Sequence, residues 1–178
     1  THDVAFVSDL KLEAGQRGVA VGERSVARRR GGDRRPGLCG LKHPWKAKDV
    51  AARLAELGAD LARIKRESDQ WGDETYEDET SKWAGHLSQT WERIFSQELV
   101  GVIVAEGRME VRPKMVRRLA LFSEEDDQQF QASYGRVSKW ANRHDKSDKV
   151  NYVAPTVKVL EDELKYVKDW FNRVRKYN

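Results

Sequence analysis

A broad apolar stripe on one predicted helix constrains the fold of this chain more than any other sequence feature. Within Ser81–Ala105, apolar residues recur at steps of three and four and comprise Trp83, Leu87, Trp91, Ile94, Phe95, Leu99 and Val102. This spacing places them on one face of an α-helix. The opposite face is polar and carries His86, Thr90, Arg93 and Gln97. A helix with such a stripe has to bury it against other elements.

One carboxylate, Glu98, falls within this apolar stripe. An ionised group on such a face is costly unless it is paired, lies at the rim, or is retained for a chemical task. The sequence leaves these interpretations open, and Glu98 is therefore kept as a candidate site residue.

Three further segments have helical periodicity. The first has a heptad-like seam, which suits an antiparallel helix partner, at Val50, Leu54, Leu57, Leu61 and Ile64. In the second, Ser123 and the acids after it resemble an N-cap and first helical turn, and the apolar face comprises Phe130, Tyr134, Val137 and Ala141. The third follows Pro155 and has Val157, Leu160, Leu164, Val167, Phe171 and Val174 on one face. We predict a mainly α protein, a helical bundle with a small β element near the N-terminus.

The N-terminal part has a different character. Thr1–Leu12 reads as a loop entering a short helix that Gly15 and Gly18 break, and Val19–Val21 and Ser25–Arg29 are predicted as one or two short strands. Arg30–Gly40 is rich in glycine and is predicted as a loop. We place a boundary between residues 1–40 and a helical domain over residues 41–178. Met109–Leu121 fits either a strand pair or a short helix.

Composition excludes several classes of protein. Charged residues make up 35% of the chain, and its apolar runs are too short to span a bilayer, so no membrane partner is expected. A single cysteine, Cys39, excludes an internal disulfide and favours a reducing, cytoplasmic location.

Basic residues are clustered, although the net charge is only +4. The clusters include five arginines that are candidates for binding nucleic acid, namely Arg28, Arg29, Arg112, Arg117 and Arg118. Such clusters can hold phosphates, but each one alone fits a solvated charged surface equally well. The histidines are scattered and no Cys-x-x-Cys occurs, so we predict no metal site. No phosphate-binding loop is present either.

Several short motifs, read in order, resemble a known family. Thr1-His2-Asp3 is similar to the switch-histidine loop of ABC-type ATPases. The later motifs are Arg24–Arg29, His43-Pro44-Trp45, Trp91-Glu92-Arg93, Ser138-Lys139-Trp140 and Arg143-His144-Asp145. This order resembles the C-terminal region of SMC/RecF-like (ABC-type) ATPases related to the PrrC and RloC anticodon nucleases.

The resemblance implies a piece of a larger ATPase. Residues 1–40 would be the end of the ATPase core, and ATP and Mg²⁺ would be bound mainly by an upstream part; the opening at Thr1 without a methionine fits that expectation. His2 would contact the γ-phosphate or the attacking water. The family also implies a homodimer through the ATPase core and a role in defence against phage.

For the helical region, the resemblance implies a centre that cleaves tRNA. Arg93 would hold a phosphate and His144 would transfer protons, assisted by an acid. The family places a Glu four residues after the Arg; here that position is Gln97, and the nearest acid is Glu98. The alternative is a non-catalytic helical domain that binds nucleic acid, for example DNA, or a partner protein.

Overall fold

The computed structural model describes residues 4–22, 25–27, 38–40, 45–104, 111–141 and 153–177. The chain divides into two compact units, with the boundary at Asp49/Val50, somewhat beyond the boundary predicted at residues 40 and 41. The first unit contains helix α1 (Val4–Gln16), strands β1 (Ser25–Ala27) and β2 (Leu38–Gly40), and the short 3-10 helix η1 (Trp45–Ala47).

Local chemistry explains the limits of α1. Gly15 lies inside the helix, which therefore runs past the predicted end. Gly18 has a φ of 67°, a left-handed conformation that glycine adopts without strain, and the Val19 N–H donates to the Ala14 carbonyl at 2.8 Å. β1 and β2 are antiparallel and pair Val26 with Cys39, whereas Val19–Val21 forms no strand. The predictions of a strand at Val19–Val21 and of a loop throughout Arg30–Gly40 are therefore wrong.

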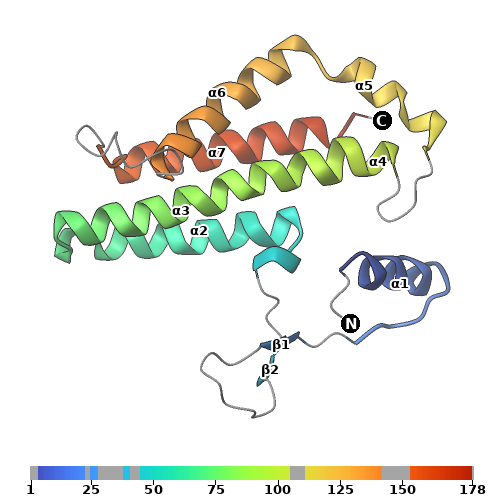
Figure 1. Ribbon diagram of the computed structural model, residues 1–178, viewed down its shortest axis with the longest axis horizontal. Helices are drawn as coiled ribbons and strands as arrows, with labels where there is room; N and C mark the ends of the chain where they lie inside the picture. Colours follow the sequence, from blue (N-terminus) through green and yellow to red (C-terminus); the bar gives the residue numbers. More distant parts are fainter. Residues whose placement is uncertain are drawn as a thin grey trace. The chain divides into compact units, whose positions relative to one another are not determined.

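The second unit is a helical bundle, which confirms the predicted fold class (Figure 1). Its four long helices are α2 (Val50–Glu67), α3 (Asp73–Ile94), α6 (Glu124–Trp140) and α7 (Val157–Val174). Shorter elements connect them, namely η2 (Ser68–Gln70), η3 (Phe95–Val100), α4 (Gly101–Ile103), η4 (Pro113–Met115) and α5 (Arg117–Leu121). Met109–Leu121 thus contains short helical turns over its described part, after one isolated bridge between Val104 and Val111.

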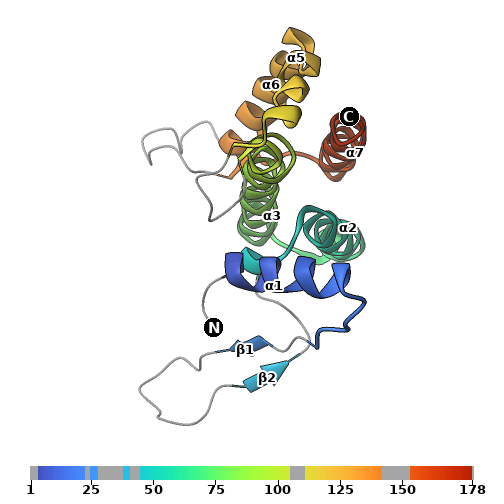
Figure 2. The same cartoon turned by 90° about the vertical axis from the view of Figure 1, so that its right-hand side faces the viewer.

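The four long helices alternate in direction. In α2 and α3, Trp83 donates its indole N–H to the Leu57 carbonyl at 2.9 Å, and Arg53 donates to the Gln89 carbonyl at 2.9 Å. The sequence positions of these partners run in opposite directions, so the two helices are antiparallel. Figure 2, which looks along the bundle, shows α3 beside α2 and α6. The fourth helix, α7, contacts the other three.

The predicted apolar faces form the core. All five seam residues of α2 are buried, as are Leu160, Leu164, Val167, Phe171 and Val174 of α7. A cluster of aromatic rings fills one part of the core and comprises Trp91, Phe95, Phe122, Phe130 and Trp170. The rings of Trp91 and Trp170 meet edge to face with centroids 4.9 Å apart, the geometry that aromatic quadrupoles favour.

Candidate functional site

The site residues predicted from the sequence fall into two groups. His2, Arg28, Arg29 and His144 lie outside the described residues, so their roles stay predictions. The described group comprises Arg93, Glu98, Arg112, Arg117 and Arg118. All five belong to the end of α3 and the elements that follow it.

Arg93 is half-buried in the last turn of α3, close to Arg53 of α2. Arg53 is buried, and this burial, together with the charge of Arg93, lowers the pKa of the Arg53 guanidinium, while Glu92 raises it. The structure therefore places two guanidinium groups near each other beside one carboxylate. The predicted polar face is less solvated than expected, because Thr90 is fully buried and donates its hydroxyl to the His86 carbonyl at 2.8 Å.

The helix does not continue as a regular α-helix through Ala105, contrary to the prediction. From Phe95 it becomes the π-helix η3, in which the Gly101 N–H donates to the carbonyl of Ser96, five residues earlier. A Cβ at Gly101 would lie 2.6 Å from the Ser96 oxygen, so only glycine fits without a shift of the backbone. The wider turn leaves Leu99 buried, Val100 57% exposed and Glu98 half-buried. Glu98 thus lies at the rim of the apolar stripe.

The segment from Arg112 to Leu121 lies against this π-helix. Arg118 is buried, and its guanidinium donates to the Glu98 carbonyl at 3.4 Å. Arg118 therefore holds the segment against the π-helix and is not available on the surface, as a nucleic-acid contact would require. Arg112, Lys114 and Arg117 are exposed, and they are interspersed with exposed apolar residues, namely Val111, Val116, Leu119 and Leu121.

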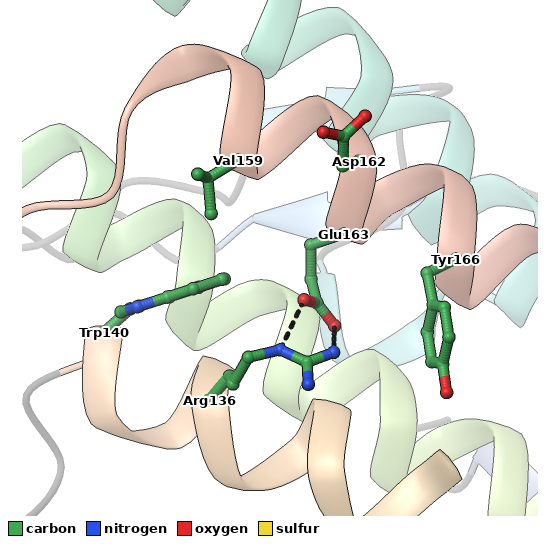
Figure 3. Close-up of a pocket in the computed structure, with 6 residues that line it drawn as sticks. All are labelled: Arg136, Trp140, Val159, Asp162, Glu163 and Tyr166. Atoms are coloured by element: carbon green, nitrogen blue, oxygen red, sulfur yellow. Dashed lines mark hydrogen bonds and ion pairs between the residues drawn. The ribbon is translucent and has the colours of Figure 1, made fainter.

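A pocket of about 290 Å³ lies between α6 and α7, and the sequence interpretation did not find it (Figure 3). Its lining comprises Arg136, Trp140, Val159, Asp162, Glu163 and Tyr166. Arg136 and Glu163 form a two-point ion pair across the helices, with Nε to Oε2 at 2.9 Å and Nη2 to Oε1 at 3.2 Å. The Arg136 guanidinium also lies over the Tyr166 ring, 5.8 Å from its centroid.

Glu163 also has hydrogen-bond partners other than Arg136. It is 5% exposed, and it accepts a hydrogen bond from the Ser133 hydroxyl, which in turn accepts one from the Trp91 indole N–H at 2.8 Å. Both Glu163 oxygens, the Ser133 hydroxyl and the Trp91 indole N–H therefore have partners, as a buried carboxylate requires. The sequence contained a signal, because Glu163 lies between Leu160 and Leu164 of the apolar face, just as Glu98 interrupts the apolar stripe predicted over Ser81–Ala105.

The described residues contain no group of three or more His, Cys, Asp or Glu side chains placed to hold a metal ion. Within the described part of the chain, no helix is long and apolar enough to cross a membrane. The described part of the second unit is thus an antiparallel helical bundle. It has a basic segment beside a π-helix and a pocket with aromatic lining between α6 and α7. Comparison with protein-family models, with curated proteins and with solved structures finds no match.

Proposed function

We propose that this chain is the C-terminal part of an ABC/SMC-like ATP-binding protein and that its helical bundle binds nucleic acid. The ordered motifs from Thr1-His2-Asp3 to Arg143-His144-Asp145 support the first part of the proposal. In it, an upstream core binds ATP and Mg²⁺, His2 completes the nucleotide site, and ATP hydrolysis is coupled to the bundle.

One observation carries the binding role: an anchored segment that exposes cations without any acid. Residues 111–122 contain four basic residues and no acidic one. Arg118 fixes the segment through the Glu98 carbonyl, while Arg112, Lys114 and Arg117 remain exposed. Cations held in place in this way can replace the counterions of a phosphate backbone without a large loss of their own freedom.

Charge reversal of this segment tests the binding role. We expect Arg112→Glu/Arg117→Glu in the full-length protein to weaken binding of a single-stranded RNA 20-mer. The slope of log K against the logarithm of the salt concentration (the salt slope) should fall in magnitude by about 1.4, since each phosphate contact contributes about 0.7. The matched control is Lys165→Glu/Lys176→Glu, which changes the net charge equally on exposed positions of α7 and its end. Equal losses in both double variants would refute a specific basic surface.

The ATPase role and any cleavage are tested with ATP and bulk tRNA on a denaturing gel. We expect ATP hydrolysis that His2→Ala abolishes, and intact tRNA. An inactive full-length protein would overturn the ATPase part of the proposal. Discrete tRNA halves that are lost in both Arg93→Ala and His144→Ala would show that the bundle is a nuclease and not only a binding domain.

A partner protein is the second candidate for the same segment. Val116, Leu119 and Leu121 are 43%, 53% and 45% exposed and lie among the cations. Apolar side chains favour a protein surface over a phosphate backbone. Polar replacement of Leu119 and Leu121 would leave RNA affinity unchanged if these residues serve a protein partner, and co-purification of that partner would be lost.

A further inference from the structure

We propose that the pocket between α6 and α7 binds a single nucleobase, which stacks on Trp140 and accepts a hydrogen bond from Arg136. The inference rests on the nucleic-acid binding proposed above and adds a second, distinct site to it. The base can come from an unpaired residue of a strand or from a free nucleotide, and the experiment below separates these two sources.

The size and lining of the pocket suit one planar ring system. A volume of about 290 Å³ lies at the lower limit of the range for small-molecule sites. Figure 3 shows Trp140 and Tyr166 on opposite sides of the Arg136–Glu163 pair, with Val159 above. Aromatic rings and guanidinium planes are the surfaces on which proteins stack unpaired bases.

The hydrogen-bonding groups of the pocket are complementary to a base edge. A guanidinium has five N–H donors, and Glu163 takes two of them from Arg136 through Nε and Nη2. Arg136 Nη1 makes no hydrogen bond to a described residue, and the side chain is 45% exposed. Asp162 adds a carboxylate acceptor at the rim of the pocket. Its Oδ1 forms an ion pair with Lys158 Nζ at 2.7 Å. The pocket thus offers both a donor and an acceptor, as a base with a carbonyl and an amino group requires.

The charges of the pocket favour a base over a phosphate. Arg136 pairs with Glu163 and Lys158 pairs with Asp162, so these four charges balance and a phosphate placed here would gain little attraction. Binding in the pocket should therefore depend little on salt, unlike binding at the basic segment of residues 111–122. The site is also preorganised, because Ser133 and Trp91 fix Glu163 and, through it, the guanidinium.

The test measures binding of a single-stranded RNA 12-mer, a duplex of the same length, and the nucleotides AMP and GMP to the full-length protein. We expect Trp140→Ala to weaken single-strand binding about 5- to 150-fold, the range for removing one base stack. Trp140→Phe should restore most of the affinity, and duplex binding and the salt slope should not change. Trp71→Ala is the matched control, because Trp71 is also half-buried but lies outside the pocket.

The outcomes distinguish the sources and the two proposals. Loss of RNA binding in Trp140→Ala assigns the pocket to a strand, whereas loss of AMP or GMP binding alone assigns it to a free nucleotide. The nucleotide arm still tests the pocket if the basic segment proves not to bind nucleic acid. The inference is overturned if the wild type binds none of these probes, if Trp140→Ala and Trp71→Ala behave alike, or if Trp140→Phe fails to restore binding while its melting temperature is unchanged.

Discussion

Replacement of Asp126 tests how the last two helices are held together. Asp126 completes a capping box at the start of α6, where it accepts from the Ser123 N–H at 3.0 Å and its own N–H donates to the Ser123 hydroxyl at 3.1 Å. The same carboxylate accepts from Arg173 in the last turn of α7 at 2.7 Å and from the hydroxyl of Tyr177, just after α7, at 2.8 Å. One side chain therefore caps one helix and ties it to the next.

The expected cost of Asp126→Ala follows from these contacts. The loss of a cap costs about 1 kcal/mol. Hydrogen bonds to a charged group contribute about 1.5–3 kcal/mol when the group is buried, and the Asp126 side chain is only 3% exposed. Arg173 is 43% exposed and can regain water, which reduces that cost. We expect a loss of about 3 kcal/mol, or roughly 6–12 °C in melting temperature for a chain of this size.

The assay is thermal unfolding by circular dichroism, with Asp127→Ala as the control. Asp127 lies in the same first turn of α6 and is exposed, and its carboxylate accepts from Gln131 at 3.3 Å. Its removal changes the helix-dipole interaction in the same way and should cost at most about 0.5 kcal/mol. Equal shifts for the two variants, or a shift below about 2 °C for Asp126→Ala, would refute the assigned role.

The pH dependence provides a second check on Asp126. Burial raises its pKa, but the hydrogen bonds from Ser123, Arg173 and Tyr177 outweigh burial, so the pKa is lowered overall. A lowered folded-state pKa stabilises the fold above the unfolded value of about 3.9, and this stability is lost as the pH falls through the folded value. The difference in stability between wild type and Asp126→Ala should therefore be constant at neutral pH and shrink at pH values below about 4.

Two further substitutions test the π-helix and the buried relay. Gly101→Ala should destabilise the fold by about 1–3 kcal/mol, because the new Cβ would meet the Ser96 carbonyl, and hydrogen exchange should rise mainly in η3; an unchanged exchange pattern would contradict this. Ser133→Ala should cost about 1–3 kcal/mol in urea unfolding, since it leaves the Trp91 indole N–H without its partner and removes one of the two hydrogen bonds to Glu163 Oε1. Ser138→Ala, a buried serine of the same helix outside this relay, is the comparison and should cost less.

Periodicity predicted the parts of the fold that apolar burial determines. The seam from Val50 to Ile64 and the face from Leu160 to Val174 are buried as predicted, and Ser123 caps its helix. These features depend on spacing and local hydrogen bonding, which a sequence displays directly.

The features that sequence reasoning missed depend on contacts between distant segments. The π-helix at Phe95–Val100 exists because Gly101 allows one wide turn and Arg118 satisfies the Glu98 carbonyl from another segment. The pocket needs Arg136 and Glu163, which are 27 residues apart. The side chains of Glu98 and Glu163 give the same sequence signal, a carboxylate within an apolar face, and only the three-dimensional partners distinguish the one at the rim from the one that is buried.

Two ion pairs with buried carboxylates fix α6 against α7. Asp126–Arg173 and Glu163–Arg136 each join a buried carboxylate to an arginine that is nearly half-exposed. Such pairs add little net stability compared with apolar residues, but removing one partner is costly. A shift of α6 along α7 by one turn would break both pairs at once, so together they select one register. That register places Arg136 opposite Glu163 and between Trp140 and Tyr166, and the contacts that align the helices are therefore the ones that shape the proposed base-binding pocket.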